Sequence, residues 1–134
     1  MMHQSYETRI RGMTMSEQEA SIIALLQLNP TVGDLEGNAA RLERFIQIAA
    51  SSGAAACVST ELAICGYPPR DLLMQSSFVE RSQQAASSLN IEVPSLIGTP
   101  TMPDHARGKP GNGLLQLGND EPVKIDTRKQ LLPT

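Results

Sequence analysis

Apolar residues alternate between short continuous runs and helical stripes along the chain. The run in residues 21–29 (SIIALLQLN) is typical of a strand buried on both faces, and Pro30 and Gly33 end it. The stripe that follows predicts a helix with apolar residues at Leu35, Ala39, Leu42, Phe45 or Ile46, and Ala49. We expect Asp34 to cap this helix and residues 51–53 (SSG) to end it.

The same order then repeats. Residues 54–59 (AAACVS) predict a second buried strand. Ser77 and Glu80 have the spacing of a capping box, which predicts the start of a second helix. The inner face of that helix is predicted to carry Phe78, Ser82, Ala85 and Leu89. Residues 93–98 (VPSLIG) predict a third strand.

A loop and a hairpin complete the pattern. Residues 99–113 (TPTMPDHARGKPGNG) hold three prolines and three glycines and predict a long loop. Residues 114–117 and 122–126 predict a β-hairpin with Gly118 and Asn119 at its turn. Strands that alternate with helices and end in a hairpin predict an α/β sheet with helices packed on it.

Composition limits the classes of function. The 134 residues are enough for one domain, and we expect residues 1–19, which show no period, to be a poorly ordered extension. The net charge of -3, with no basic stripe, argues against nucleic acid as a partner. No apolar run has the length of a membrane span or of a signal-peptide core. The two cysteines give no disulfide framework, so we expect a cytoplasmic protein.

Glu61 is the first candidate for chemistry, because it directly follows the strand predicted at residues 54–59. Functional groups of α/β sheets gather at the carboxyl ends of strands. Glu61 is therefore either a general base or a solvated turn residue, and position alone favours the turn. Lys129 follows the last predicted strand and is a candidate for stabilising an oxyanion. Lys124 and Arg128 are equally placed on charge alone.

The remaining candidates are weaker. Cys65 lies four residues after Glu61, so it is either a nucleophile or a small apolar filler, and the filler is favoured. Cys57 is predicted to point into the core and to be inert. His105, beside Asp104, has no second ligand at metal-binding spacing, so no metal site is expected.

Three segments, taken together, resemble a known family. They are residues 25–38 (LLQLNPTVGDLEGN), 61–73 (ELAICGYPPRDLL) and 128–134 (RKQLLPT). In order and spacing they are similar to the amino-terminal glutaminase domain of the glutamine-dependent NAD+ synthetases. That domain is a carbon-nitrogen hydrolase of the nitrilase superfamily. The resemblance covers residues 20–134, and the Gly-Tyr-Pro-Pro-x-Asp-Leu-Leu segment is specific to this branch.

The resemblance implies a fold and a site. The fold would be part of a nitrilase-type αββα sandwich, incomplete at its carboxyl end. Glu61 matches the general base, and Lys129 matches the lysine that supports the tetrahedral intermediate. Neither Cys57 nor Cys65 aligns with the nucleophilic cysteine, which the family carries downstream of the lysine, after Thr134. We therefore expect the 134 residues alone to be inactive, and poorly stable or self-associating.

The resemblance also implies partners. The full-length enzyme would hydrolyse the side-chain amide of glutamine and pass ammonia to a carboxyl-terminal synthetase domain. That domain converts nicotinic acid adenine dinucleotide to NAD+ and would require ATP and Mg2+, whereas no cofactor is expected in this segment. Relatives form homo-oligomers. Two alternatives stay open: another amidase of the nitrilase superfamily, and a non-catalytic product of an interrupted gene or a partner-binding subunit.

Overall fold

A single sheet with helices on one side forms the body of the protein. The computed structural model describes residues 20–103, 107–118 and 123–125. Within them the strands run in the order β1-β2-β3-β4-β5 across the sheet. The first three strands are parallel and the last two antiparallel, with bounds β1 Ile22–Leu26, β2 Ala54–Ser59, β3 Ser95–Thr101, β4 Gly111–Leu117 and β5 Val123–Ile125. The alternating α/β order predicted from the sequence is confirmed.

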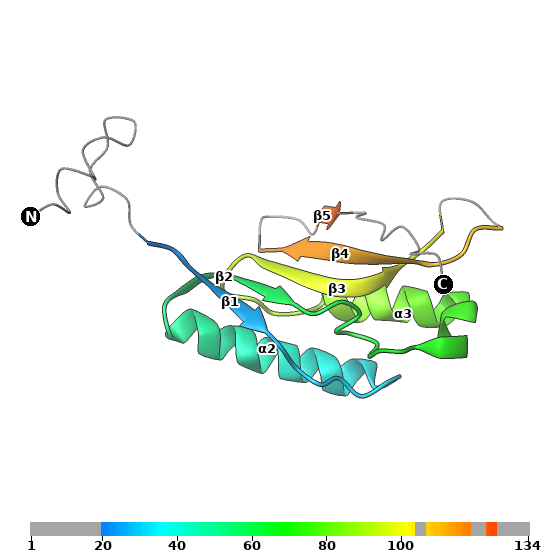
Figure 1. Ribbon diagram of the computed structural model, residues 1–134, viewed down its shortest axis with the longest axis horizontal. Helices are drawn as coiled ribbons and strands as arrows, with labels where there is room; N and C mark the ends of the chain where they lie inside the picture. The colour runs from blue at the N-terminus through cyan, green and yellow to red at the C-terminus, as the bar shows by residue number, and fades with distance from the viewer. Residues whose placement is uncertain (1–19, 104–106, 119–122, 126–134) are drawn as a thin grey trace, which may run out of the picture.

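The helices α2 (Leu35–Ser51) and α3 (Ser76–Ser87) lie on the same side of the sheet, α2 below β1 and β2 and α3 below β3 (Figure 1). A 3-10 helix, η2 (Arg70–Met74), leads into α3. One continuous core fills the space between the helices and the sheet. Its buried members include Leu42, Ile46, Phe78, Ala86, Cys57, Ile97, Leu115 and Leu117.

The start and end of α2 agree with the sequence prediction. Asp34 caps the helix, because its Oδ1 accepts a hydrogen bond from the Gly37 N–H at 3.0 Å. Ile46 faces the core, whereas Phe45 is 40% exposed, which settles the choice between these two residues. Gly53 follows the helix with a φ of 93°, a conformation that glycine adopts without strain.

The predicted capping box of α3 is wrong. The N-cap is Gln75, which makes no side-chain capping bond, so Ser77 is already the second helical residue. The N–H groups of Phe78 and Val79 donate instead to the Gln75 carbonyl, because η2 delivers the chain already turned into the helix. The predicted inner face is correct for Phe78 and Ser82, which are buried.

The burial predicted for β1 is also wrong. Ile22 and Ile23 are each 58% exposed and Leu25 is 68% exposed, while Leu26 is buried. Within the described part of the chain β1 pairs only with β2, and no helix lies on its second face (Figure 1). An apolar run shows that a strand avoids polar residues, but it does not show which faces are covered.

Apolar residues continue from β1 across that second face. Pairing in register aligns Leu25 with Val58, Val58 with Leu96, and Leu96 with Gln116. Paired residues of neighbouring strands share a face, so these side chains form one row on the side away from the helices. We call these four residues the outer row.

The loop predicted at residues 99–113 is shorter in the structure. Strand β3 continues to Thr101 and β4 begins at Gly111, with Pro100 opposite Asn112. A proline is tolerated there because β2 pairs with β3 only at Ser95 and Leu96, so among the described residues Pro100 has a neighbouring strand on one side. The hairpin of β4 and β5 is confirmed, while Asn119 of its predicted turn lies outside the described residues.

Candidate active site

Glu61 lies where the sequence predicts, directly after the carboxyl end of β2. The loop that carries it rests on β3 at Gly98. A Cβ atom on Gly98 would lie 2.3 Å from the Thr60 carbonyl oxygen and 2.7 Å from the Leu62 nitrogen. Such contacts do not occur in proteins, so only glycine allows the Glu61 backbone to approach β3 this closely.

Two hydrogen bonds join this region to Gly98 of β3, and a third links Ser59 of β2 to the start of the loop. The Gly98 N–H donates to Ser59 Oγ at 2.9 Å, and Ser59 Oγ donates in turn to the Thr60 carbonyl at 2.9 Å. On the far side of Glu61, the Ile64 N–H donates to the Gly98 carbonyl at 3.3 Å. Leu62, the residue after Glu61, has a φ of 50°, a strained value for leucine that gives the loop its sharp turn. The backbone of Glu61 is therefore fixed on both sides.

Asn38 of α2 joins the Glu61 loop to the loop that follows β1. Its side chain is 3% exposed. Its Nδ2 donates to the carbonyls of Thr31 and Ile64, both at 2.8 Å, and its Oδ1 accepts from the Thr31 N–H at 2.9 Å. The Gly33 N–H adds a bond of 2.9 Å to the Cys65 carbonyl. Residues 25–38 and 61–73, the first two of the three family-like segments, are thus bonded to each other.

Asn112 is a hydrogen-bond partner of the Glu61 carboxylate. The carboxylate is exposed, and its Oε2 accepts a hydrogen bond of 2.8 Å from Asn112 Nδ2. Sequence reasoning missed Asn112 because it assigned residues 99–113 to a loop. The available signal was its place two residues before the apolar residues of the predicted hairpin strand, which in the structure begins at Gly111.

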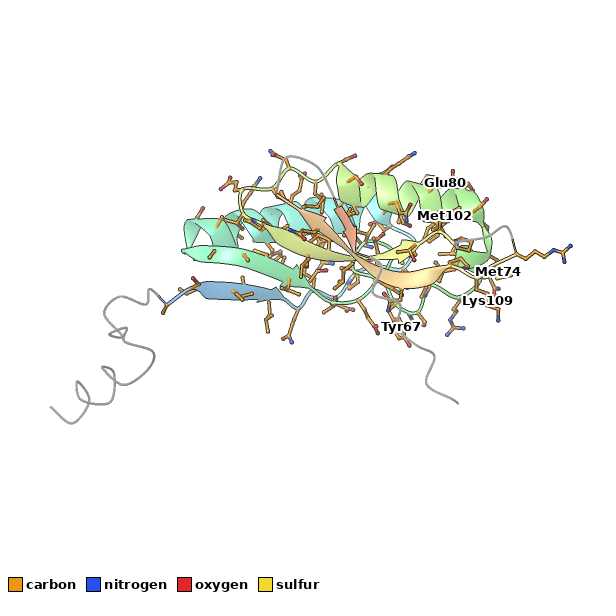
Figure 2. All side chains as sticks on the ribbon, turned by 90° about the horizontal axis from the view of Figure 1, so that it is seen from above. Tyr67, Met74, Glu80, Met102 and Lys109 are labelled. Atoms are coloured by element: carbon orange, nitrogen blue, oxygen red, sulfur yellow. The ribbon has the colours of Figure 1, made fainter. Side chains whose placement is uncertain are left out.

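The segment that follows the Glu61 loop turns on two prolines. The peptide bond between Tyr67 and Pro68 is cis, and Pro69 is buried ahead of η2. Tyr67 is 66% exposed, and Figure 2 shows its side chain projecting away from the body of the protein.

Both cysteines are packed inside the protein. Cys65 is fully buried, and burial raises the pKa of its thiol to about 11. Its Sγ donates to the Gly66 carbonyl at 3.4 Å. Cys57 is 1% exposed, and burial raises its pKa as well. A neutral, buried thiol is a poor nucleophile, so the structure favours the filler role for Cys65 and the inert role for Cys57.

The other candidate residues fall outside the described part of the chain. These are Lys129, Arg128, His105 and Asp104. Strand β5 places the backbone of Lys124 opposite Leu115. Among the residues that the structure describes, no three His, Cys, Asp or Glu side chains form a cluster that could hold a metal ion. The helices within the same residues are too short or too polar to cross a membrane.

The fold and the Glu61 loop define a class of protein. The carbon-nitrogen hydrolase family matches residues 22–132, which is most of the chain, so the protein belongs to this family. Within it, the chain is similar to glutamine-dependent NAD+ synthetases, as the family-like segments predict. It is 38% identical over 120 residues to the enzyme of Synechocystis sp., and 36% identical over 81 residues to that of Thermotoga maritima.

These alignments cover unequal shares of the two proteins. The Synechocystis alignment covers 84% of this chain and 21% of the relative, and the Thermotoga alignment covers 57% and 14%. The aligned part of the chain therefore spans about a fifth of the length of the Synechocystis enzyme and about a seventh of that of the Thermotoga enzyme.

Solved structures agree with the fold. A glutamine-dependent NAD+ synthetase from Cytophaga hutchinsonii superposes with a TM-score of 0.64 at 22% identity, covering 77% of this chain and 18% of the other. An amidase of the nitrilase superfamily from Nesterenkonia superposes with a TM-score of 0.61 at 18% identity, covering 75% and 39%. The predicted nitrilase-type fold is confirmed.

Proposed function

We propose that the chain is part of the glutamine-hydrolysing domain of a glutamine-dependent NAD+ synthetase. In that enzyme, ammonia released from glutamine serves the ATP-dependent conversion of nicotinic acid adenine dinucleotide to NAD+. The observation that carries the proposal is the rigid Glu61 loop, within a chain 38% identical to the Synechocystis enzyme. ATP and Mg2+ belong to the synthetase domain in this proposal, and the setting is the cytoplasm.

Glu61 is the general base in this function. A thiol near pH 7 is mostly protonated and needs a base to become a nucleophile. A carboxylate serves that purpose best when it is held in one position, and the bonds across Gly98 and Asn38, which hold the backbone of the Glu61 loop, support this assignment. Lys129 is assigned the oxyanion that forms when the thiolate attacks the amide carbon.

The thiol itself is not one of the two cysteines in this chain. Cys57 and Cys65 are both buried, and the Cys65 thiol keeps its proton to about pH 11. The proposal therefore assigns the nucleophile to residues beyond the 134, and the isolated chain releases no ammonia from glutamine. The coding sequence after the codon for Thr134 is an independent check. An open frame that supplies a cysteine supports the proposal, and a stop codon favours a non-catalytic product.

The direct test is a chimera. Residues 20–134 replace the matching segment of the Synechocystis synthetase, and ammonia release from glutamine is measured with the unchanged segment and with Glu61→Gln. The glutamine variant keeps the shape of the side chain and removes the base, so we expect kcat to fall by about 100-fold or more. Glu80→Gln, at an exposed position of α3, is the matched control and leaves kcat unchanged. An unchanged rate in Glu61→Gln contradicts the assignment.

A further inference from the structure

We propose that Asn112 is a positioning residue for the Glu61 carboxylate. This inference rests on the proposed function of Glu61 as a general base and adds a residue to it. Asn112 Nδ2 donates to Glu61 Oε2 at 2.8 Å, a bond between side chains 51 positions apart in the sequence. Through this bond, β4 contacts the candidate base.

The sheet brings these two residues together across an intervening strand. Glu61 follows β2, Asn112 is the second residue of β4, and β3 lies between the two strands. Pro100 pairs with Asn112 and Gly98 pairs with Leu114. Because side chains alternate along a strand, Asn112 projects from the same face of the sheet as the missing side chain of Gly98.

That face is the one on which the Glu61 loop rests. A Cβ on Gly98 would point into the backbone of residues 60–62, so the loop crosses β3 there. Pro100 lies two positions further along β3 and pairs with Asn112 of β4. This pairing brings Asn112 within reach of the Glu61 side chain. Because Gly98 has no side chain, the Glu61 loop can lie against β3. Asn112 then donates the hydrogen bond to the Glu61 carboxylate.

An asparagine suits this task chemically. Its amide donates a hydrogen bond but carries no charge and does not titrate, so it orients the carboxylate without competing for the proton of a thiol. Holding Oε2 restricts rotation about the last torsion of the Glu61 side chain, which is broad in a free glutamate. The proton-accepting group is then preset before substrate arrives, and a displacement of about 1 Å costs such sites on the order of 100-fold in rate.

The first test uses the full 134-residue chain and nuclear magnetic resonance. The side-chain amide peaks of Asn112, assigned by their loss in Asn112→Asp, are followed in the unchanged chain, in Glu61→Gln and in Glu80→Gln. At one fixed pH, we expect the peaks to lie at clearly different positions in Glu61→Gln than in the unchanged chain, and at the same positions in Glu80→Gln as in the unchanged chain. If the Asn112 amide peaks keep the same positions in Glu61→Gln, the hydrogen bond between Asn112 and Glu61 is refuted.

The second test separates positioning from structural support. Asn112→Leu has nearly the same shape and lacks the amide donor without adding a charge beside Glu61, so in the Synechocystis chimera we expect kcat for glutamine hydrolysis to fall about 10- to 100-fold with KM changed less than about threefold. Asn90→Leu, at an exposed position after α3, is the control and leaves both constants unchanged. A kcat equal to that of the unchanged chimera overturns the inference. A chimera with no glutamine hydrolysis at all contradicts the proposed function instead, and the resonance experiment then decides the pairing on its own.

Discussion

Gly98→Ala is the substitution that most directly probes how the Glu61 loop is held. The new methyl group would lie 2.3 Å from the Thr60 carbonyl oxygen, 2.7 Å from the Leu62 nitrogen and 2.9 Å from the Glu61 carbonyl carbon. All three neighbours are backbone atoms, which cannot swing aside as a flexible side chain can. The loop must therefore lift away from β3.

The free-energy change follows from two contributions. Overpacking a close contact costs about 1–3 kcal/mol. Lifting the loop also weakens the bond from the Gly98 N–H to Ser59 Oγ and the bond from the Ile64 N–H to the Gly98 carbonyl, each worth about 1 kcal/mol. We expect a total destabilisation of about 2–4 kcal/mol, which lowers the urea midpoint by roughly 1–2 M.

Gly53→Ala is the matched control for this assay. It is the same substitution at a position where an added Cβ meets no atom within 4 Å, and only the φ of 93° adds strain, of about 1 kcal/mol. Both variants retain the outer row with its exposed Leu25, so self-association affects them equally at a fixed protein concentration. A Gly98→Ala midpoint no lower than that of Gly53→Ala, with the Asn112 amide peaks unmoved, refutes the reasoning.

Three further predictions concern the rest of the structure. Asn38→Ala should lower the free energy of unfolding by about 2–4 kcal/mol in urea titrations, because one buried and two partly buried hydrogen bonds are lost. Asn38→Asp should be no better, since it sets a charge against two carbonyl oxygens, and a loss below about 0.5 kcal/mol contradicts this prediction. The Cys65 thiol ionises near pH 9.0 when unfolded but near pH 11 when folded, so stability present below pH 9 should fall by on the order of 2 kcal/mol between pH 9 and 11. In urea titrations between pH 9 and 11, the free energy of unfolding should fall less in Cys65→Ala than in the unchanged chain. An equal fall in the two proteins would contradict a buried Cys65 thiol. Leu25→Lys should reduce self-association in sedimentation velocity with little change in stability, because Leu25 is 68% exposed; a monomeric unchanged chain at every concentration argues against an adhesive outer row.

The sequence predicts those elements whose ends carry local signals. Helix α2 is placed correctly because Asp34 and Gly53 mark its ends by side-chain and backbone chemistry, and because one stripe faces the core. The start of α3 is misplaced because the chain arrives through η2, and a turn already formed needs no Ser-Glu pair. In this chain, the capping signal is reliable for α2, which follows a loop, and fails for α3, which follows a helical turn.

The errors in the sheet have a different physical origin, since they depend on neighbours far away in the sequence. Strand β1 has the apolar run of a covered strand, but the described residues place no helix on its outer face. The extension of β3 past Pro100 depends on β4 alone, and proline signals a loop when that partner is unknown. Asn112 was missed for the same reason, because its partner Glu61 becomes its neighbour only through the order of the sheet.

The central claim is that Glu61 activates the hydrolysis of glutamine within a synthetase. The most direct measurement compares two nitrogen donors in the Synechocystis chimera, by following NAD+ formation from nicotinic acid adenine dinucleotide with glutamine and then with free ammonia. We expect Glu61→Gln to lower the glutamine-driven rate by about 100-fold or more while the ammonia-driven rate is unchanged. Equal rates with glutamine in the two chimeras would contradict the account.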